Sequence, residues 1–219
     1  MPRRRRNRRS GWAKTTRVLA GGKRFGKAFV KSFATPVLAT LAKRFITSIA
    51  VAGAPLVTTA AARQKVDLSM IPRNITSIDS QVNNRVGNKV FIKGISLMGL
   101  ASAIVGAPQQ FIRIILTRQS DPADNIELTD VYAPTGTTNG IRVLMDKAYR
   151  LDVASANNGN DGKVIKRYVS VNAPLLFNGT ALTGTDRDEG TCVLYLFSDN
   201  AATGFNFVGS STLHYREML

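Results

Sequence analysis

The spacing of apolar residues differs between the first 65 residues and the rest of the chain. Before residue 65, a spacing near four is typical of one face of an amphipathic helix. Because Pro36 lacks a backbone donor, the pattern predicts two helices, near 23–34 and 37–51. The recurring apolar residues are Phe25, Phe29, Phe33, Val37, Leu41, Phe45 and Ile49.

After residue 65, apolar and polar positions tend to alternate, and Gly and Pro clusters separate the alternating segments. A period of two predicts β-strands. Segment 110–118 is rich in β-branched residues, and 191–198 is a largely apolar run of the kind found in a strand buried within a sandwich. The predicted strands are 66–71, 74–79, 89–101, 110–118, 141–153, 163–171, 174–178, 191–198 and 205–216.

With 66–71 and 74–79 taken together, about eight strands and no strong helix after residue 65 predict an all-β fold, an eight-stranded antiparallel jelly-roll sandwich with a basic, partly helical N-terminal arm. The expected boundaries are 1–65 for the arm and 66–219 for the sandwich domain. Segment 121–131 is the exception among the strands and turns. There Asp121 precedes Pro122 and further acids follow, so we expect a short helix within a loop.

The excess positive charge lies in the predicted arm. The chain of 219 residues has 30 Lys and Arg against 14 Asp and Glu, a net charge of +16. Residues 1–65 contain 16 of the basic residues and no acid, whereas 66–219 contain 14 of each sign. An acid-free cationic segment repels itself and is ordered by a counter-charge, which favours nucleic acid as its partner. Such binding tolerates any sequence and weakens steeply with salt.

The candidate nucleic-acid-binding residues are the cations near the N-terminus. Arginine binds phosphate through two parallel hydrogen bonds, and lysine binds it as a point charge. The same residues also fit an amphipathic helix on a membrane surface, a mitochondrial transit peptide, a plain structural helix or a solubilising tail. The candidates are Arg3, Arg4, Arg5, Arg6, Arg8, Arg9, Lys14, Arg17, Lys23, Arg24, Lys27 and Lys31.

An uncharged stretch at 45–62 is near the lower length limit of a membrane span. Gly53, Pro55 and several Ser and Thr make it only weakly apolar. We therefore expect a helix end followed by a linker, and no stable membrane insertion.

The chain has little material for catalysis. One cysteine, Cys192, excludes an intramolecular disulfide framework, and one histidine, His214, leaves no set for a triad or zinc site. We expect Cys192 in the core and His214 in a strand or an interface. No enzymatic activity is expected.

Acidic residues recur at a spacing of three in 121–130. Calcium at a contact between subunits is one use of such a cluster, although the spacing does not fit an EF-hand loop. We prefer helix capping and a solvated face, and predict no cofactor. The residues are Asp121, Asp124, Glu127 and Asp130.

Three short motifs, taken in order, carry a family resemblance. Val82–Gly94 contains an Asn-x-Arg-x-Gly turn that leads into a long strand, Gln110–Leu116 is followed by Asp121, and Val143–Lys147 begins a further strand. With the arginine arm, residues 65–219 resemble the small single-jelly-roll capsid proteins, such as the coat proteins of satellite tobacco necrosis virus and of small circular Rep-encoding single-stranded DNA viruses.

The resemblance implies a viral capsid protein that self-assembles into a small icosahedral T=1 shell of about 60 copies. It would package a single-stranded genome in the virion. The sequence leaves DNA and RNA open, and the arginines near residue 3, which would also serve nuclear import, favour DNA and assembly in the host nucleus. If each cation neutralised about one phosphate, the arms of such a shell would balance roughly a kilobase of single strand. The alternative is a monomeric β-sandwich binding module with an N-terminal mitochondrial-targeting or membrane-active segment.

Overall fold

Eight β-strands make up the regular structure of the described residues. The computed structural model describes residues 42–52, 64–73, 84–121, 123, 126, 140–152, 162–179, 185–199 and 204–218. The strands are β1 (Lys43–Val51), β2 (Gln64–Asp67), β3 (Lys89–Ala103), β4 (Gln110–Gln119), β5 (Ile141–Leu151), β6 (Lys163–Leu176), β7 (Thr191–Ser198) and β8 (Phe205–Glu217).

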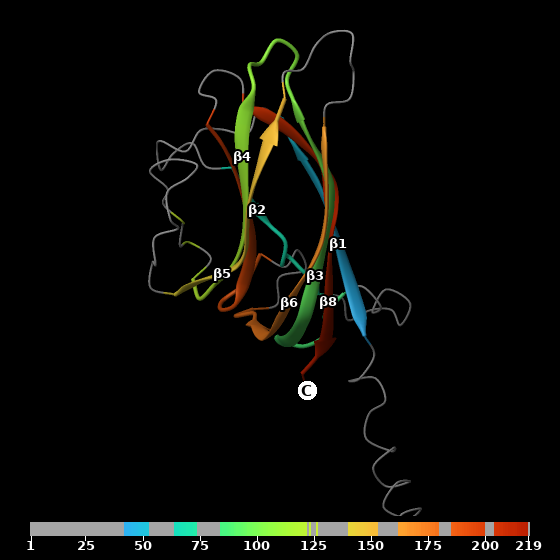
Figure 1. The fold of residues 1–219 in the computed structure, drawn as a ribbon. Helices are drawn as coiled ribbons and strands as arrows, with labels where there is room; N and C mark the ends of the chain where they lie inside the picture. The colour runs from blue at the N-terminus through green and yellow to red at the C-terminus, as the bar shows by residue number, and fades with distance from the viewer. Residues whose placement is uncertain are drawn as a thin grey trace, which may run out of the picture. The chain divides into compact units, whose positions relative to one another are not determined.

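The strands form two four-stranded antiparallel sheets that face each other (Figure 1). The first sheet has the order β1-β8-β3-β6, and the second has the order β2-β7-β4-β5. Strands that follow one another along the chain lie in opposite sheets, with one exception. The exception is β4 and β5, which pair with each other in the second sheet. Long crossings between two sheets in this order are those of a jelly roll, so the predicted all-β sandwich is confirmed.

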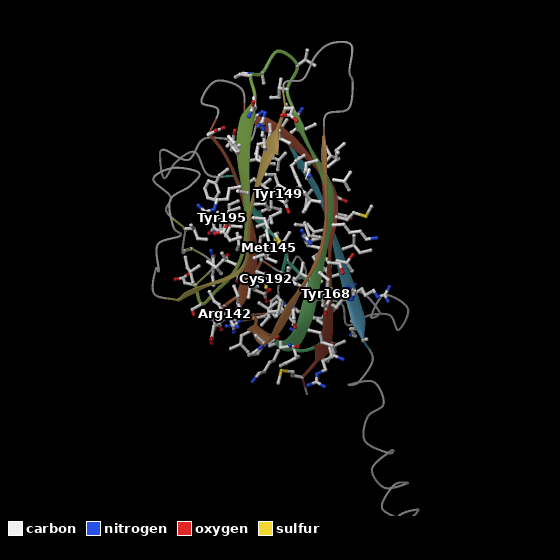
Figure 2. All side chains as sticks on the ribbon, viewed as in Figure 1. Arg142, Met145, Tyr149, Tyr168, Cys192 and Tyr195 are labelled. Atoms are coloured by element: carbon white, nitrogen blue, oxygen red, sulfur yellow. The ribbon has the colours of Figure 1, made fainter. Side chains whose placement is uncertain are left out.

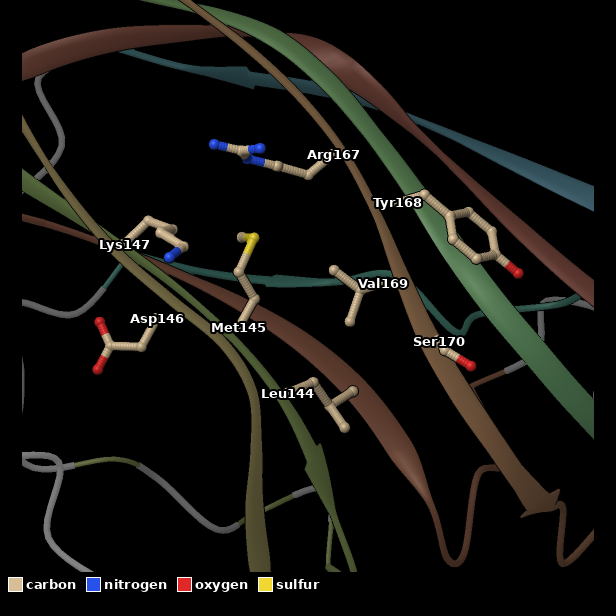
Figure 3. Close-up of a pocket in the computed structure, with 8 residues that line it drawn as sticks. All are labelled: Leu144, Met145, Asp146, Lys147, Arg167, Tyr168, Val169 and Ser170. Atoms are coloured by element: carbon tan, nitrogen blue, oxygen red, sulfur yellow. The ribbon is translucent and has the colours of Figure 1, made fainter.

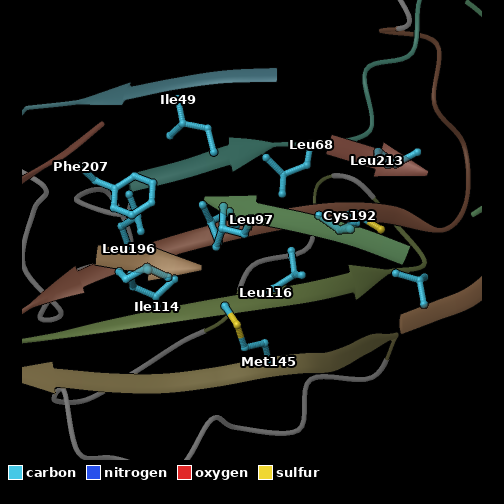
Figure 4. Close-up of a cluster of buried hydrophobic side chains, with 14 of the residues drawn as sticks. Ile49, Leu68, Leu97, Ile114, Leu116, Met145, Cys192, Leu196, Phe207 and Leu213 are labelled. Carbon is cyan, nitrogen blue, oxygen red and sulfur yellow. The ribbon is translucent and has the colours of Figure 1, made fainter. Parts of the chain in front are cut away.

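The main core fills the space between the two sheets (Figure 4). The first sheet contributes alternate residues such as Ile49, Leu97 and Phe207, and the second contributes Ile114 and Leu196. All five are buried, at 2% exposure or less. Burying side chains of this size contributes about 1.5–3 kcal/mol each, and this is the main force that holds the sheets together.

The two central strands of the second sheet, β7 and β4, are also covered on their outer face. All eight residues of β7 are buried, as the apolar run 191–198 predicts. The outward residues Val193, Tyr195 and Phe197 pack with Ile115 of β4 and with Ile126 from the β4–β5 connection. The Tyr195 ring, labelled in Figure 2, stacks on the Phe197 ring with the two centroids 6.1 Å apart.

The helix predicted over 37–51 is wrong for Lys43–Val51, which form β1. This strand pairs with β8 along its whole length, from Lys43 opposite Tyr215 to Val51 opposite Phe207. A spacing of four is also an even number, so Phe45 and Ile49 share a face in a strand as well as in a helix. The β-branched residues between them favour the strand. The sandwich therefore begins before residue 66, while the helix predicted near 23–34 lies outside the described residues.

The two strands predicted at 163–171 and 174–178 are one strand, β6. Its pairing with β3 shifts between Ile92 and Gly94, which accommodates an extra residue near Asn172. Asn172 has a φ of 48°, a left-handed conformation that asparagine tolerates better than most residues. Pro174 is accepted because β6 lies at the edge of its sheet.

Two further predicted segments fall mostly outside the description. The strand expected at 74–79 is not among the described residues, and of 121–131 the structure describes only 121, 123 and 126. The Asp121 carboxylate accepts a hydrogen bond from the Ala123 backbone N–H at 2.7 Å, which is a local capping contact.

Candidate functional site

The outer side of the first sheet carries many exposed side chains among the described residues. We call the outward side chains of β1, β8, β3 and β6 the exposed face. Alternation places them opposite the core residues, so that Ile46, Thr212, Ser96 and Tyr168 lie in one row across the four strands. The exposed face is therefore built from the same strands that carry half of the core.

The charge of the first sheet is strongly positive. Its strands carry eight Lys and Arg, two each in β1 and β3, three in β6 and one in β8, against the single carboxylate of Glu217. Glu217 is buried and bonds Lys43 at 2.9 Å. The strands of the second sheet carry six Lys and Arg and two Asp, and one of these carboxylates, Asp146, is held by Arg113 through two hydrogen bonds of 2.7 and 2.6 Å. By alternation, Arg44, Lys166 and Arg216 lie on the exposed face, whereas Lys163 and Arg167 lie on the other side of β6, so the exposed face is cationic through part of this set.

One end of the exposed face is apolar. Val208, Leu100 and Val164 lie opposite one another on β8, β3 and β6. Val208 and Val164 are 61% and 66% exposed, and Met98 beside them is 58% exposed. They line a shallow groove of about 390 Å³ whose floor includes Gly99 and Gly209. An apolar cluster open to solvent is typical of a contact surface.

A second groove, of about 490 Å³, lies between β5 and β6, where the edges of the two sheets meet (Figure 3). Met145 and Val169 line it, and Asp146 and Lys147 lie on its β5 side. The Asp146 carboxylate is already held by Arg113. The groove is therefore an opening into the core between two edge strands, and its carboxylate serves the β4–β5 pairing.

Arg85 links both sheets at one end of the sandwich. Its guanidinium is fully buried, binds both carboxylate oxygens of Asp186 at 2.7 Å, and lies 3.8 Å from the centre of the Phe177 ring. It also donates to the backbone carbonyls of Ile71 and Gly87. A buried cation with so many partners positions several loops at once. This is the arginine of the Asn-x-Arg-x-Gly motif, and its role in the structure is to join segments.

The predicted nucleic-acid-binding cations, from Arg3 to Lys31, lie outside the described residues, so the structure does not place them. Asp124, Glu127 and Asp130 of the acidic cluster also lie outside. Among the residues that the structure does describe, no three His, Cys, Asp or Glu side chains are grouped so as to hold a metal ion. The same described part of the chain contains no helix that is long and apolar enough to span a membrane.

The single cysteine and the single histidine of the chain both lie in strands, as predicted. Cys192 is buried in β7, and burial, together with the charge of Asp67, raises the pKa of its thiol to about 12. His214 lies on β8, where its Nε2 is 3.0 Å from Ser96 Oγ. Partial burial and the nearby Arg44 charge lower the pKa of His214, so its imidazole stays neutral near neutral pH.

Sequence reasoning missed the exposed face as a surface. Its cations are scattered one or two to a strand, so no cluster is visible along the chain. The alternation of β8 from Phe205 to Glu217 carries the signal, with serine, threonine and histidine on one side and aromatic and apolar residues on the other.

Comparisons with known proteins give limited information. No protein-family model and no curated protein sequence matches the chain. Among solved structures, the chain is similar to one titled Desmodium yellow mottle tymovirus, with 11% sequence identity and a TM-score of 0.33. That match covers 82% of this chain and 90% of the other chain. A likeness of this degree carries no functional argument, so function is inferred from the residues themselves.

Proposed function

We propose that the protein is a viral capsid protein, which self-assembles into a closed shell and packages single-stranded nucleic acid through its basic N-terminal segment. The observation that carries this proposal is the separation of charge. Residues 1–41 contain 12 Lys and Arg and no acid, and they are joined directly to β1 of a jelly-roll sandwich.

The sandwich supplies what a shell needs. Jelly-roll sandwiches recur in viral capsids, and also in lectins and cupins. A cupin site needs metal ligands, and the described residues do not group them. The apolar end of the exposed face, around Leu100, Val164 and Val208, offers a surface that a neighbouring copy can bury. Fold alone does not determine function, so charge and surface carry the argument.

The finer proposal is an icosahedral T=1 shell of about 60 copies, the smallest closed shell that identical subunits form with this symmetry. The packaged strand is proposed to be DNA, because the arginines at 3–9 also suit nuclear import. Binding to phosphate by arginine forks needs no enzyme chemistry, and we propose no enzymatic activity.

Velocity sedimentation of the full-length chain tests the proposal. Absorbance at two wavelengths across the boundary separates protein from nucleic acid. A fast, uniform species that contains nucleic acid is expected, and nuclease digestion after disruption then identifies DNA or RNA. A slow, nucleic-acid-free monomer at low salt would contradict the proposal and favour the monomeric binding module.

A truncation separates the two parts of the molecule. Because β1 begins at Lys43, the deletion should end at residue 41 and leave the first sheet complete. We expect the truncated chain to fold and to lose nucleic acid. The same nucleic-acid content with and without residues 1–41 would contradict the role given to them.

A further inference from the structure

Tyr168 is exposed but held in place. It lies on the exposed face, with 61% of its surface open to solvent. Its ring nevertheless covers Gly94 of the neighbouring strand β3, since a Cβ built at Gly94 would lie only 2.6 Å from Tyr168 Cζ. Glycine at position 94 is therefore required for the ring to lie against the sheet. An aromatic side chain that is already ordered loses little entropy when a ligand binds to it.

His214 extends this aromatic surface. Gly94 is directly opposite His214 in the β3–β8 pairing. The Tyr168 and His214 ring centroids are 5.9 Å apart, with an angle of 59° between the ring planes, and Ser96 Oγ bonds the imidazole. In Figure 3, Tyr168 points to the side of β6 opposite Arg167 and Val169. Three strands thus build one platform on the exposed face, which we call the Tyr168–His214 platform.

Cations flank the platform on two sides. Lys166 precedes Tyr168 by two residues on β6, so it shares the same face at a distance of about 7 Å along the strand. Arg44 lies opposite His214 on β1. Both are exposed, and within the described ranges neither forms an ion pair. Glu217, the only carboxylate of these strands, is buried against Lys43.

We propose that the Tyr168–His214 platform, with Lys166 and Arg44, is a second binding site for the single-stranded nucleic acid, separate from the N-terminal segment. A base stacks on Tyr168 and the neighbouring phosphates bind Lys166 and Arg44. Stacking combined with cations is the usual means of binding single strands without sequence preference. This inference rests on the proposed function and adds a defined site to it.

Charge favours a polyanion over the same platform of a second copy as the occupant of this platform. Two copies of the platform packed against each other would bring Lys166 and Arg44 of both close together without a carboxylate, which is unfavourable. The apolar end, at Val164 and Val208, is the part of the face that suits protein contact. A nucleic acid strand supplies the missing negative charge and the planar bases.

The salt dependence of binding tests whether Arg44 and Lys166 contact phosphates. Full-length protein, freed of nucleic acid at high salt, is titrated with a fluorescent oligothymidylate at several salt concentrations, with oligouridylate in parallel. For the double variant Arg44→Gln/Lys166→Gln, the slope of log Kd against log salt should fall by about 1.4, or about 0.7 per cation. The matched control is Lys147→Gln on β5, also an exposed strand lysine, which should leave the slope unchanged.

The aromatic contribution has a different signature. Tyr168→Ala should weaken binding by about 5- to 150-fold without changing the salt slope, and Tyr168→Phe should restore it. Photochemical crosslinking of the wild-type chain to bromouracil-substituted DNA should label the peptide that contains Tyr168. Because crosslinking uses the unaltered protein, it does not depend on how the variants fold.

The reactivity of His214, the single histidine, shows whether another protein copy covers the platform. Carbethoxylation of His214 should be fast in nucleic-acid-free protein and slowed by oligothymidylate. An unreactive His214 in nucleic-acid-free assemblies would overturn the inference, because a second copy would then cover the platform. Crosslinks confined to residues 1–41, with unchanged slopes in the face variants, would overturn it and leave the proposed function intact. A chain that neither assembles nor binds either oligonucleotide would overturn both.

Discussion

The two sheets of the sandwich have the same number of strands but opposite surroundings. In the second sheet β4 and β7 are buried on both faces, with all of β7 inaccessible and its outer aromatic residues packed with Ile126, while β5 at the edge has exposed residues. The first sheet is buried on one face only, and its other face carries exposed cations, hydroxyls and Tyr168. Arg113 of β4 is paired with Asp146 of β5, whereas in the first sheet Lys43 is paired with the buried Glu217, and the exposed Arg44 and Lys166 form no ion pair within the described residues.

This difference separates stability from function. Residues of β4 and β7 are buried inside the molecule, so changes there should affect folding. Residues on the exposed face have few partners within the described chain, so changes there should affect binding and leave folding nearly unchanged. Matched substitutions in the two sheets test this separation directly.

The largest difference is expected in thiol reactivity. At mildly alkaline pH, the pKa of about 12 leaves Cys192 with roughly a thousandfold less thiolate than a thiol with the ordinary value of 9.0. In Ser210→Cys, on the exposed face, the added thiol should react rapidly with an aromatic disulfide reagent while Cys192 stays unreactive until the protein unfolds. Rapid modification of Cys192 in the native wild type would show that the second sheet is open.

Two arginines that lie over aromatic rings give the next comparison. Arg85→Met leaves the Asp186 carboxylate without its bidentate partner in a largely buried site, and should cost about 3–5 kcal/mol of unfolding free energy. Arg216→Met removes an exposed cation 4.9 Å from the Phe91 ring and should cost less than about 1 kcal/mol. Urea denaturation of disassembled protein at high salt measures both, and equal losses would contradict the distinction.

A smaller difference in unfolding free energy is expected between two tyrosines, one in each sheet. The Tyr195 hydroxyl accepts a hydrogen bond from the Gln119 side-chain amide inside the second sheet. Tyr195→Phe leaves that buried amide without this acceptor, and should lower the unfolding free energy by about 1–2 kcal/mol. Tyr168→Phe, on the exposed face, should change it by less than about 0.5 kcal/mol. The same denaturation assay compares them, and a larger loss for Tyr168→Phe would reverse the assignment.

The smallest effect concerns His214 and pH. Partial burial and then the Arg44 charge lower its pKa, and Tyr168 of β6, Ser96 of β3 and Arg216 of its own strand are the other groups around it. Because the folded-state pKa lies below the unfolded value of about 6.5, the contribution to stability is present above that pH. It is lost as the pH falls through the folded-state pKa.

Arg44→Gln removes one cause of this shift, so the pKa of His214 should rise towards its ordinary value. The rate of carbethoxylation as a function of pH measures this pKa, since only the neutral imidazole reacts and the chain has one histidine. At mildly acidic pH the variant should react more slowly than the wild type. An unchanged profile would show that Arg44 does not act on His214.

The sequence determined the class of fold and most of its strands. The runs at 89–101, 110–118 and 191–198 are in strands, as expected from their alternation or from short, apolar stretches rich in β-branched and aromatic residues. The sequence also determined the charge separation, because a count of acids and bases needs no coordinates. Cys192 in the core follows from its apolar neighbours alone.

Only the tertiary structure decided the state of 43–51 and the existence of the exposed face. The fourfold spacing of Phe45 and Ile49 fits a helix and a strand equally, and pairing with β8 is a contact across more than 150 residues of chain that local spacing cannot encode. The Tyr168–His214 platform brings together residues of β6, β3 and β8, with Arg44 from β1 beside them, through sheet register. Arg85 likewise meets Asp186 from 101 residues away. Such contacts depend on how distant segments pack, because the free energy that selects them arises from burial shared among several strands.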